Sequence, residues 1–119
     1  MGTLNVEVIV RNLDARERSH ALSLAVDTGA THTILPARVI DALGIHPTGT
    51  ARVRLANGSV DEWPATAVLM RLEEKEWPTI ALVGPSDGPA LLGAVTLEEF
   101  RLAVDPVARR LIPADAASV

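Results

Sequence analysis

Apolar and polar side chains alternate over several short segments of this chain, which predicts β-strands that each bury one face. The clearest alternation covers residues 4–10, and a short apolar run at 22–26, which includes Ser23, indicates a strand covered on both faces. The polar residues 11–20 between these segments predict a connecting loop. Further strands are predicted at residues 51–55, 65–72, 77–83, 90–93, 102–105 and 109–112.

Three short signals separate these strands. Pro36 stands where a first-turn proline would, and the residues after it predict a two-turn helix over 37–43 that stops at Gly44. The Asn-Gly pair at 57–58 predicts a tight two-residue turn between two strands. The segment 96–99 begins with threonine and ends with glutamate, so it matches the capping box of a second helix.

Eight or so short strands with one or two brief helices predict an all-β fold, built as a barrel or a sandwich. Long helices never alternate with the strands as βαβ units require. At 119 residues the chain is long enough for one core and too short for two lobes. We therefore expect a single domain over residues 1–119, in which residues 113–119 form a flexible tail.

Composition argues against several classes of function. The net charge is −4 and the basic residues form no stripe, so nucleic acid is not expected as a partner. The absence of cysteine excludes disulfides, thiolate zinc sites and a cysteine nucleophile. His20, His32 and His46 match no zinc pattern, so no metal or other cofactor is expected. Without a signal segment or an apolar run of about 20 residues, we expect a cytoplasmic protein that does not bind a membrane.

Asp27 is a carboxylate in an unusual position for a strand. Asp27 ends the apolar run 22–26 and is followed by Thr28 and Gly29. Strands disfavour aspartate, and a carboxylate that loses water contacts without a partner is costly. The Asp-Thr-Gly sequence is either a simple turn, in which aspartate bonds its own backbone, or a site that uses the carboxylate. The local sequence leaves both interpretations open, so distant residues have to decide between them.

The distant segment is Leu91-Leu92-Gly93, an apolar strand that ends in glycine. Together with residues 25–30 and the apolar pair at 34–35, it resembles the retropepsin-like aspartic proteases, the single-domain relatives of the retroviral enzymes. The resemblance runs from about residue 22 to 112 and implies the acid-protease barrel of that family. It also implies roles for individual residues. By this match Asp27 is the catalytic acid, and the residues that support its loop are Thr28, Gly29, Ala30 and Gly93.

The resemblance also implies a homodimer. Hydrolysis of a peptide bond by this route needs one carboxylate to take a proton from water and another to donate one to the carbonyl oxygen. The chain has a single Asp-Thr-Gly, so two copies of Asp27 would meet on a two-fold axis. The hairpin with Asn57, Gly58 and Ser59 at its tip occupies the position of the family's flap, which covers the substrate and offers it backbone hydrogen bonds.

Two functions remain open on this sequence. The first is an aspartic endopeptidase that cleaves an extended peptide in a protein substrate. The alternative is a peptide-binding or scaffold module that keeps the fold and cleaves nothing. The intact sequence around Asp27 favours the enzyme, because a pure binding module has less reason to keep an awkwardly placed carboxylate. Thr31 and His32 stand where the retroviral enzymes usually carry acidic residues, so substrate contacts are not transferred from them.

Overall fold

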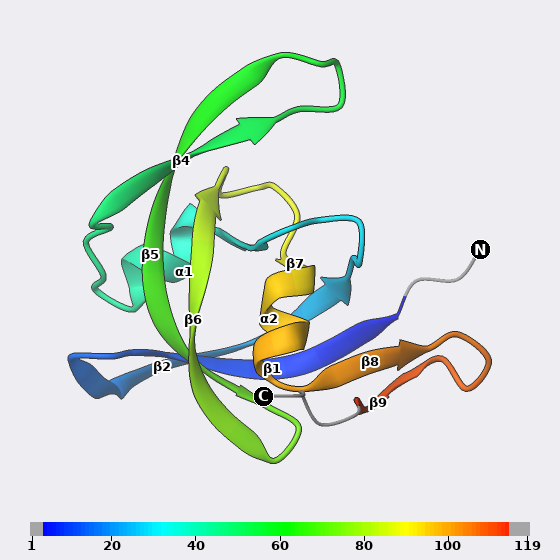
Figure 1. The fold of residues 1–119 in the computed structure, drawn as a ribbon. Coiled ribbons are helices and arrows are strands. Elements are labelled where there is room, and N and C mark those ends of the chain that lie inside the picture. Colours follow the sequence, from blue (N-terminus) through cyan, green and yellow to red (C-terminus); the bar gives the residue numbers. More distant parts are fainter. Residues whose placement is uncertain (1–3, 115–119) are drawn as a thin grey trace, which may run out of the picture.

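A computed structural model describes residues 4–114 of the chain (Figure 1). Most of these residues lie in short strands, and two helices of six residues each lie among them. In chain order the elements are β1 (Asn5–Asn12), β2 (Ala15–Val26), β3 (Thr33–Pro36), α1 (Ala37–Ala42), β4 (Gly49–Arg54), β5 (Val60–Leu72), β6 (Lys75–Gly84), β7 (Leu91–Leu92), α2 (Ala94–Glu99), β8 (Leu102–Asp105) and β9 (Arg110–Pro113).

Seven of the strands form one sheet that closes on itself. Its strand order is β1-β2-β7-β3-β6-β5-β4, and β1 pairs in addition with β5. The remaining two strands, β8 and β9, form a separate antiparallel hairpin. A closed sheet with only two short helices confirms the all-β fold expected from the sequence.

The core inside the closed sheet is mostly aliphatic, with Phe100 as its one buried aromatic side chain among the described residues. Val10, Leu24, Leu35 and Leu92 come from four different strands and are completely buried. The two helices add their own buried side chains, Val39 and Ile40 from α1 and Leu97 from α2. Burial of each large aliphatic side chain contributes about 1.5–3 kcal/mol to folding, so this shared core fixes how the strands lie relative to one another.

The polar segment 11–20 is not a loop, contrary to the sequence-based prediction. It forms the ends of β1 and β2, which pair antiparallel from Val10↔His20 to Asn12↔Ala15 around a tight turn. Most of its side chains are exposed or half-buried. A hairpin arm without a buried face shows no apolar alternation, because backbone pairing and polar contacts, such as the Arg11–Glu76 ion pair, hold it in place of a buried apolar face.

The hairpin between β4 and β5 is confirmed, but its turn is longer than two residues. The N–H of Gly58 donates to the Leu55 carbonyl at 2.9 Å, and the N–H of Leu55 donates to the Ser59 carbonyl at 2.8 Å. Gly58 has a φ of 87°, in the left-handed region that only glycine adopts at little cost. A turn followed by a left-handed glycine is the common arrangement of longer hairpin loops.

The first predicted helix is confirmed and the second begins earlier than predicted. Helix α1 starts after Pro36 and is followed by Gly44 with a φ of 68°. Helix α2 starts at Ala94, so Thr96 lies inside it and caps nothing. The Thr96 hydroxyl bonds other buried hydroxyls, because tertiary partners outcompete the helix terminus for it.

The predicted flexible tail begins too early at residue 113. Pro113 lies in β9 opposite Leu102, and the N–H of Ala114 donates to the Arg101 carbonyl at 2.8 Å. Residues 115–119 lie outside the described residues. Within residues 4–114, no helix has the length and apolar character needed to cross a membrane.

Candidate active site

The loop that carries Asp27 begins where β2 ends, and backbone bonds hold it in place. The N–H of Asp27 donates to the Leu92 carbonyl at 3.0 Å, which continues the parallel pairing of β2 with β7. The N–H of Ala30 donates to the Asp27 carbonyl at 3.1 Å and closes a tight turn. The backbone of Asp27 is therefore fixed from both sides, as a side chain placed for chemistry requires.

The carboxylate of Asp27 is half-exposed, and one of its oxygens is held. Oδ1 accepts the N–H of Gly29 at 2.9 Å. A Cβ atom at Gly29 would approach this oxygen to 3.2 Å, so a residue with a side chain would crowd the carboxylate. Among residues 4–114 no group hydrogen-bonds to Oδ2, which leaves that oxygen for water or a partner.

Strand β7 and the start of α2 lie directly beside this loop. Leu91 pairs with Ala25 of β2 on one side and with Ile34 of β3 on the other. The first N–H groups of α2, those of Ala94 and Val95, donate to the carbonyls of residues 30 and 31 at 2.8 and 3.0 Å. The structure thus brings together the two distant segments that carry the family resemblance, residues 25–30 and 91–93.

Gly93 joins β7 to α2 at the tightest contact of this region. Its φ of −94° and ψ of 174° suit any residue, so conformation does not require a glycine here. The lack of space around this residue does require a glycine. A Cβ atom would lie 2.8 Å from the backbone nitrogen of Thr33 and closer still to the carbonyl group of His32.

A chain of three buried threonine hydroxyls runs beneath the loop. The Oγ1 atoms of Thr33 and Thr96 are 2.6 Å apart, and those of Thr96 and Thr79 are 2.8 Å apart. At one end the Gly93 N–H donates to Thr33, and at the other Thr79 donates to the Glu99 carboxylate at 2.7 Å. Because each hydroxyl has one proton, Thr96 must donate to Thr79 and Thr33 to Thr96. Each of these three threonine hydroxyls therefore donates one hydrogen bond and accepts another.

Replacing Thr96 by valine is expected to destabilise the protein by about 1–3 kcal/mol, because the buried Thr33 hydroxyl loses the acceptor of its proton and the Thr79 hydroxyl loses its donor. Chemical denaturation at a fixed protein concentration measures this loss. Thr66→Val is the matched control, since Thr66 is also buried but its hydroxyl lies 3.5 Å from its acceptor, the limit of a hydrogen bond. Equal losses in the two variants would contradict a role for the threonine chain.

The β4–β5 hairpin extends beyond the closed part of the sheet, with Asn57, Gly58 and Ser59 exposed at its tip (Figure 1). The Asn57 Oδ1 accepts two hydrogen bonds from Ser59, one from its backbone N–H at 2.9 Å and one from its side-chain hydroxyl at 2.6 Å. A cavity of about 480 Å³ lies between the Asp27 loop and β4, lined by residues 29–32 and 52–54. The stem of the hairpin, and not its tip, lines this space.

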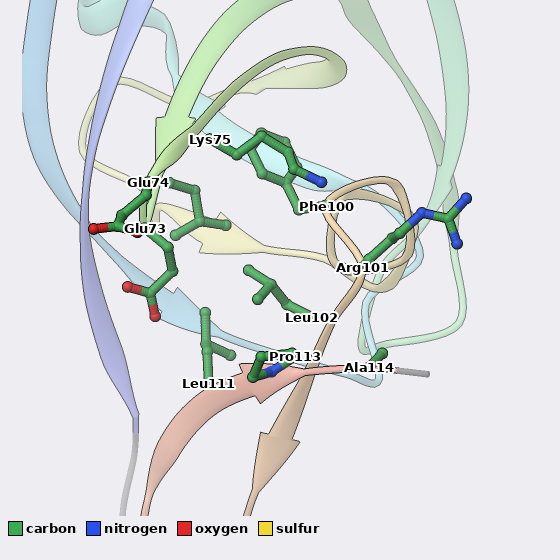
Figure 2. A pocket seen from close by; sticks show the side chains of 10 residues that line it. Glu73, Glu74, Lys75, Phe100, Arg101, Leu102, Leu111, Pro113 and Ala114 are labelled. Atoms are coloured by element: carbon green, nitrogen blue, oxygen red, sulfur yellow. The ribbon is translucent and has the colours of Figure 1, made fainter. Parts of the chain in front are cut away.

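A cavity of about 580 Å³ lies at the other end of β5, between the β5–β6 turn and the β8–β9 hairpin (Figure 2). Apolar side chains such as Phe100, Leu102 and Leu111 line it, together with the exposed Glu73 and Lys75. It includes no residue of the Asp27 loop, so its greater size does not make it the candidate site. In the described part of the chain, no three His, Asp or Glu side chains lie close enough to hold a metal ion.

Comparison with protein-family models decides the family of this chain. Residues 14–99 match the family described as "gag-polyprotein putative aspartyl protease". The chain belongs to this family. The matched range includes both Asp27 and the β7 segment, so the resemblance to retropepsin-like aspartic proteases is confirmed.

Solved structures of retroviral proteases share the fold of this aspartyl protease. The EIAV protease complexed with the inhibitor HBY-793 is 18% identical, with a TM-score of 0.63 over 83% of this chain and 88% of that one. The solution structure of the simian foamy virus (mac) protease is 17% identical, with a TM-score of 0.58 over 81% and 93% of the two chains. No curated protein sequence matches the chain significantly.

Two groups of residues near the loop are not predicted by the sequence alone. The threonine chain was not foreseen, because Thr33 and Thr79 lie 63 and 17 residues from Thr96 and no local pattern joins them. Arg52 and Arg54 of β4 alternate with apolar residues, which by itself predicts only the polar face of a strand. Their signal was the repeated positive charge on one face of a hairpin expected to cover the substrate.

Proposed function

We propose that this protein is an aspartic endopeptidase whose active site forms when two copies of Asp27 meet in a homodimer. The family supports protease function, and each chain contributes a single Asp-Thr-Gly. The observation that carries the proposal is the Asp27 carboxylate itself. Its Oδ1 is held by the Gly29 N–H, while its Oδ2 has no partner among the described residues and the side chain stays half-exposed.

In the proposed reaction, the ionised carboxylate of the pair takes a proton from a water molecule, and the water oxygen bonds to the carbonyl carbon of the substrate. The protonated carboxyl group gives its proton to the carbonyl oxygen. The resulting tetrahedral diol then transfers a proton to the peptide nitrogen, and the carbon–nitrogen bond breaks. The products are a new carboxyl group and a new amine, and no cofactor takes part.

The residues around Asp27 have supporting roles in this proposal. Thr28 is exposed next to the carboxylate, where its hydroxyl would bond the partner subunit. Ala30 and Gly93 keep the loop against α2 and β3, since larger residues at Gly93 have no room. The hairpin tip at residues 57–59 would close over the substrate as a flap and offer it backbone hydrogen bonds.

Activity and mass in solution test this proposal together. The purified protein is incubated with a denatured protein mixture over a range of pH and protein concentration, and new peptide ends are identified by mass spectrometry. We expect cleavage whose specific rate rises with the dimer fraction, measured by light scattering. Cleavage by a strict monomer would contradict the shared pair. Tight peptide binding without cleavage at any pH would favour the alternative, a binding or scaffold module.

A further inference from the structure

The cavity between the Asp27 loop and β4 has aliphatic and polar lining and a basic edge. Ile34 and Leu82 give it aliphatic surface from two strands, and Thr31 and His32 also line it. Arg52 and Arg54 also line it, and both are exposed. Within residues 4–114, no acidic side chain lines the cavity. Its charge is therefore positive and is not neutralised from within.

The two arginines are largely available to a ligand. Arg54 uses one Nη1 contact, to the Gly58 carbonyl at 3.1 Å. Arg52 makes no hydrogen bond or ion pair with any described residue, although Glu62 stands opposite it on β5. The neighbouring Asp61 is already engaged, because its carboxylate accepts the Glu62 N–H and the Trp63 indole N–H. Guanidinium donors without a protein partner suit a carboxylate from outside the chain.

The position of the cavity ties it to the proposed chemistry. Gly29 and Ala30, two and three residues after Asp27, form part of its wall, whereas Asp27 itself does not line it. A substrate side chain in the cavity would thus lie beside the reacting carboxylates without touching them. β4 belongs to the hairpin that would cover the peptide, so the arginines would approach the substrate as that hairpin closes.

We propose that this cavity is a substrate subsite that selects an acidic side chain, glutamate above all, next to the scissile peptide bond. The aliphatic wall would pack against the methylene groups of the glutamate, and Arg52 and Arg54 would bind its carboxylate. Aspartate, with a shorter stem, would reach the arginines less well. This subsite rests on the proposed function, and it narrows the substrate to peptides with an acidic residue near the cleaved bond.

Paired octapeptides test the subsite. Each pair consists of alanine, valine and leucine residues and differs only by Glu or Gln at one of the six central positions. At one position we expect kcat/KM to favour Glu by about tenfold or more, the range for a hydrogen bond to a charged group. The preference should decline in 1 M salt, because the arginines are exposed and their charges are screened. Equal cleavage of Glu and Gln at every position would overturn the subsite and leave the peptidase intact.

Variants test whether Arg52 and Arg54 cause the preference for Glu over Gln. In Arg52→Ala/Arg54→Ala the ratio of Glu to Gln cleavage should fall close to one, and Arg52→Lys/Arg54→Lys should restore part of it because the charge returns. Arg71→Ala is the matched control, since Arg71 is exposed on β5 outside the cavity and should leave the ratio unchanged. A preference that survives in the double alanine variant would assign it to other residues and overturn the proposal.

A binding measurement separates failure of the subsite from failure of the peptidase. The same peptides, labelled with fluorescein, are titrated with the protein by fluorescence anisotropy. If nothing is cleaved but Glu peptides still bind more tightly than Gln peptides in an arginine-dependent way, the subsite stands and the peptidase fails. If neither cleavage nor a difference in binding is found, both are overturned.

Discussion

Asp27→Asn is expected to lower peptide cleavage by roughly a thousandfold or more, while the fold is kept. The amide oxygen can still accept the Gly29 N–H that now bonds Oδ1 at 2.9 Å, so the loop has no reason to move. What the variant lacks is a carboxylate that exchanges protons with water and substrate. Cleavage of a denatured protein mixture, followed by mass spectrometry, measures the loss.

Two further measurements make the Asp27→Asn result specific. Asp41→Asn, which changes an exposed aspartate on α1, should cleave like the wild type. Mixing inactive Asp27→Asn with wild-type protein should lower activity by more than dilution does, because exchanged dimers carry one carboxylate in place of two. Full activity in Asp27→Asn, or activity that follows dilution alone despite subunit exchange, would contradict a shared pair.

Gly93→Ala is expected to reduce stability by about 2–4 kcal/mol and to reduce cleavage with it. The new methyl group would overlap the backbone of residues 32 and 33, and backbone cannot move aside as a flexible side chain can. Either β7 or the Asp27 loop must shift, and the bond from the Asp27 N–H to the Leu92 carbonyl connects the two. Chemical denaturation and cleavage rates, measured at equal protein concentration, report both effects.

Gly49→Ala provides the matched control for this substitution. Gly49 begins β4, and a Cβ atom there would meet nothing within 4 Å. Its replacement should change stability little, since no neighbour has to move. Similar losses at both glycines would show that the space around Gly93 is not the cause and would contradict the packing argument.

The sequence predicts the strands whose side chains the core buries, and it does not predict the strands whose side chains stay exposed. Residues 22–26 and 65–72 each place aliphatic side chains in the core, Leu24 from the first and Val68 and Met70 from the second, and each is predicted as a strand. Residues 11–20 also pair, with a register shift between Arg11 and Asn12, but they have no buried face, so their polar sequence indicated a loop. The turn at 55–59 was located correctly, while its length depends on backbone bonds that no residue type specifies alone.

The candidate site likewise combines features that the sequence predicts with features that only the tertiary structure shows. By itself the sequence determined that Asp27 ends an apolar strand, that Gly29 follows two residues later, and that a second apolar strand ends at Gly93, while the family resemblance linked the two segments. These features are local in the chain, so residue type and spacing express them. Only the tertiary structure decided the threonine chain beneath the loop and the two arginines at the edge of its cavity. Both depend on contacts between distant strands, which form only when the sheet closes.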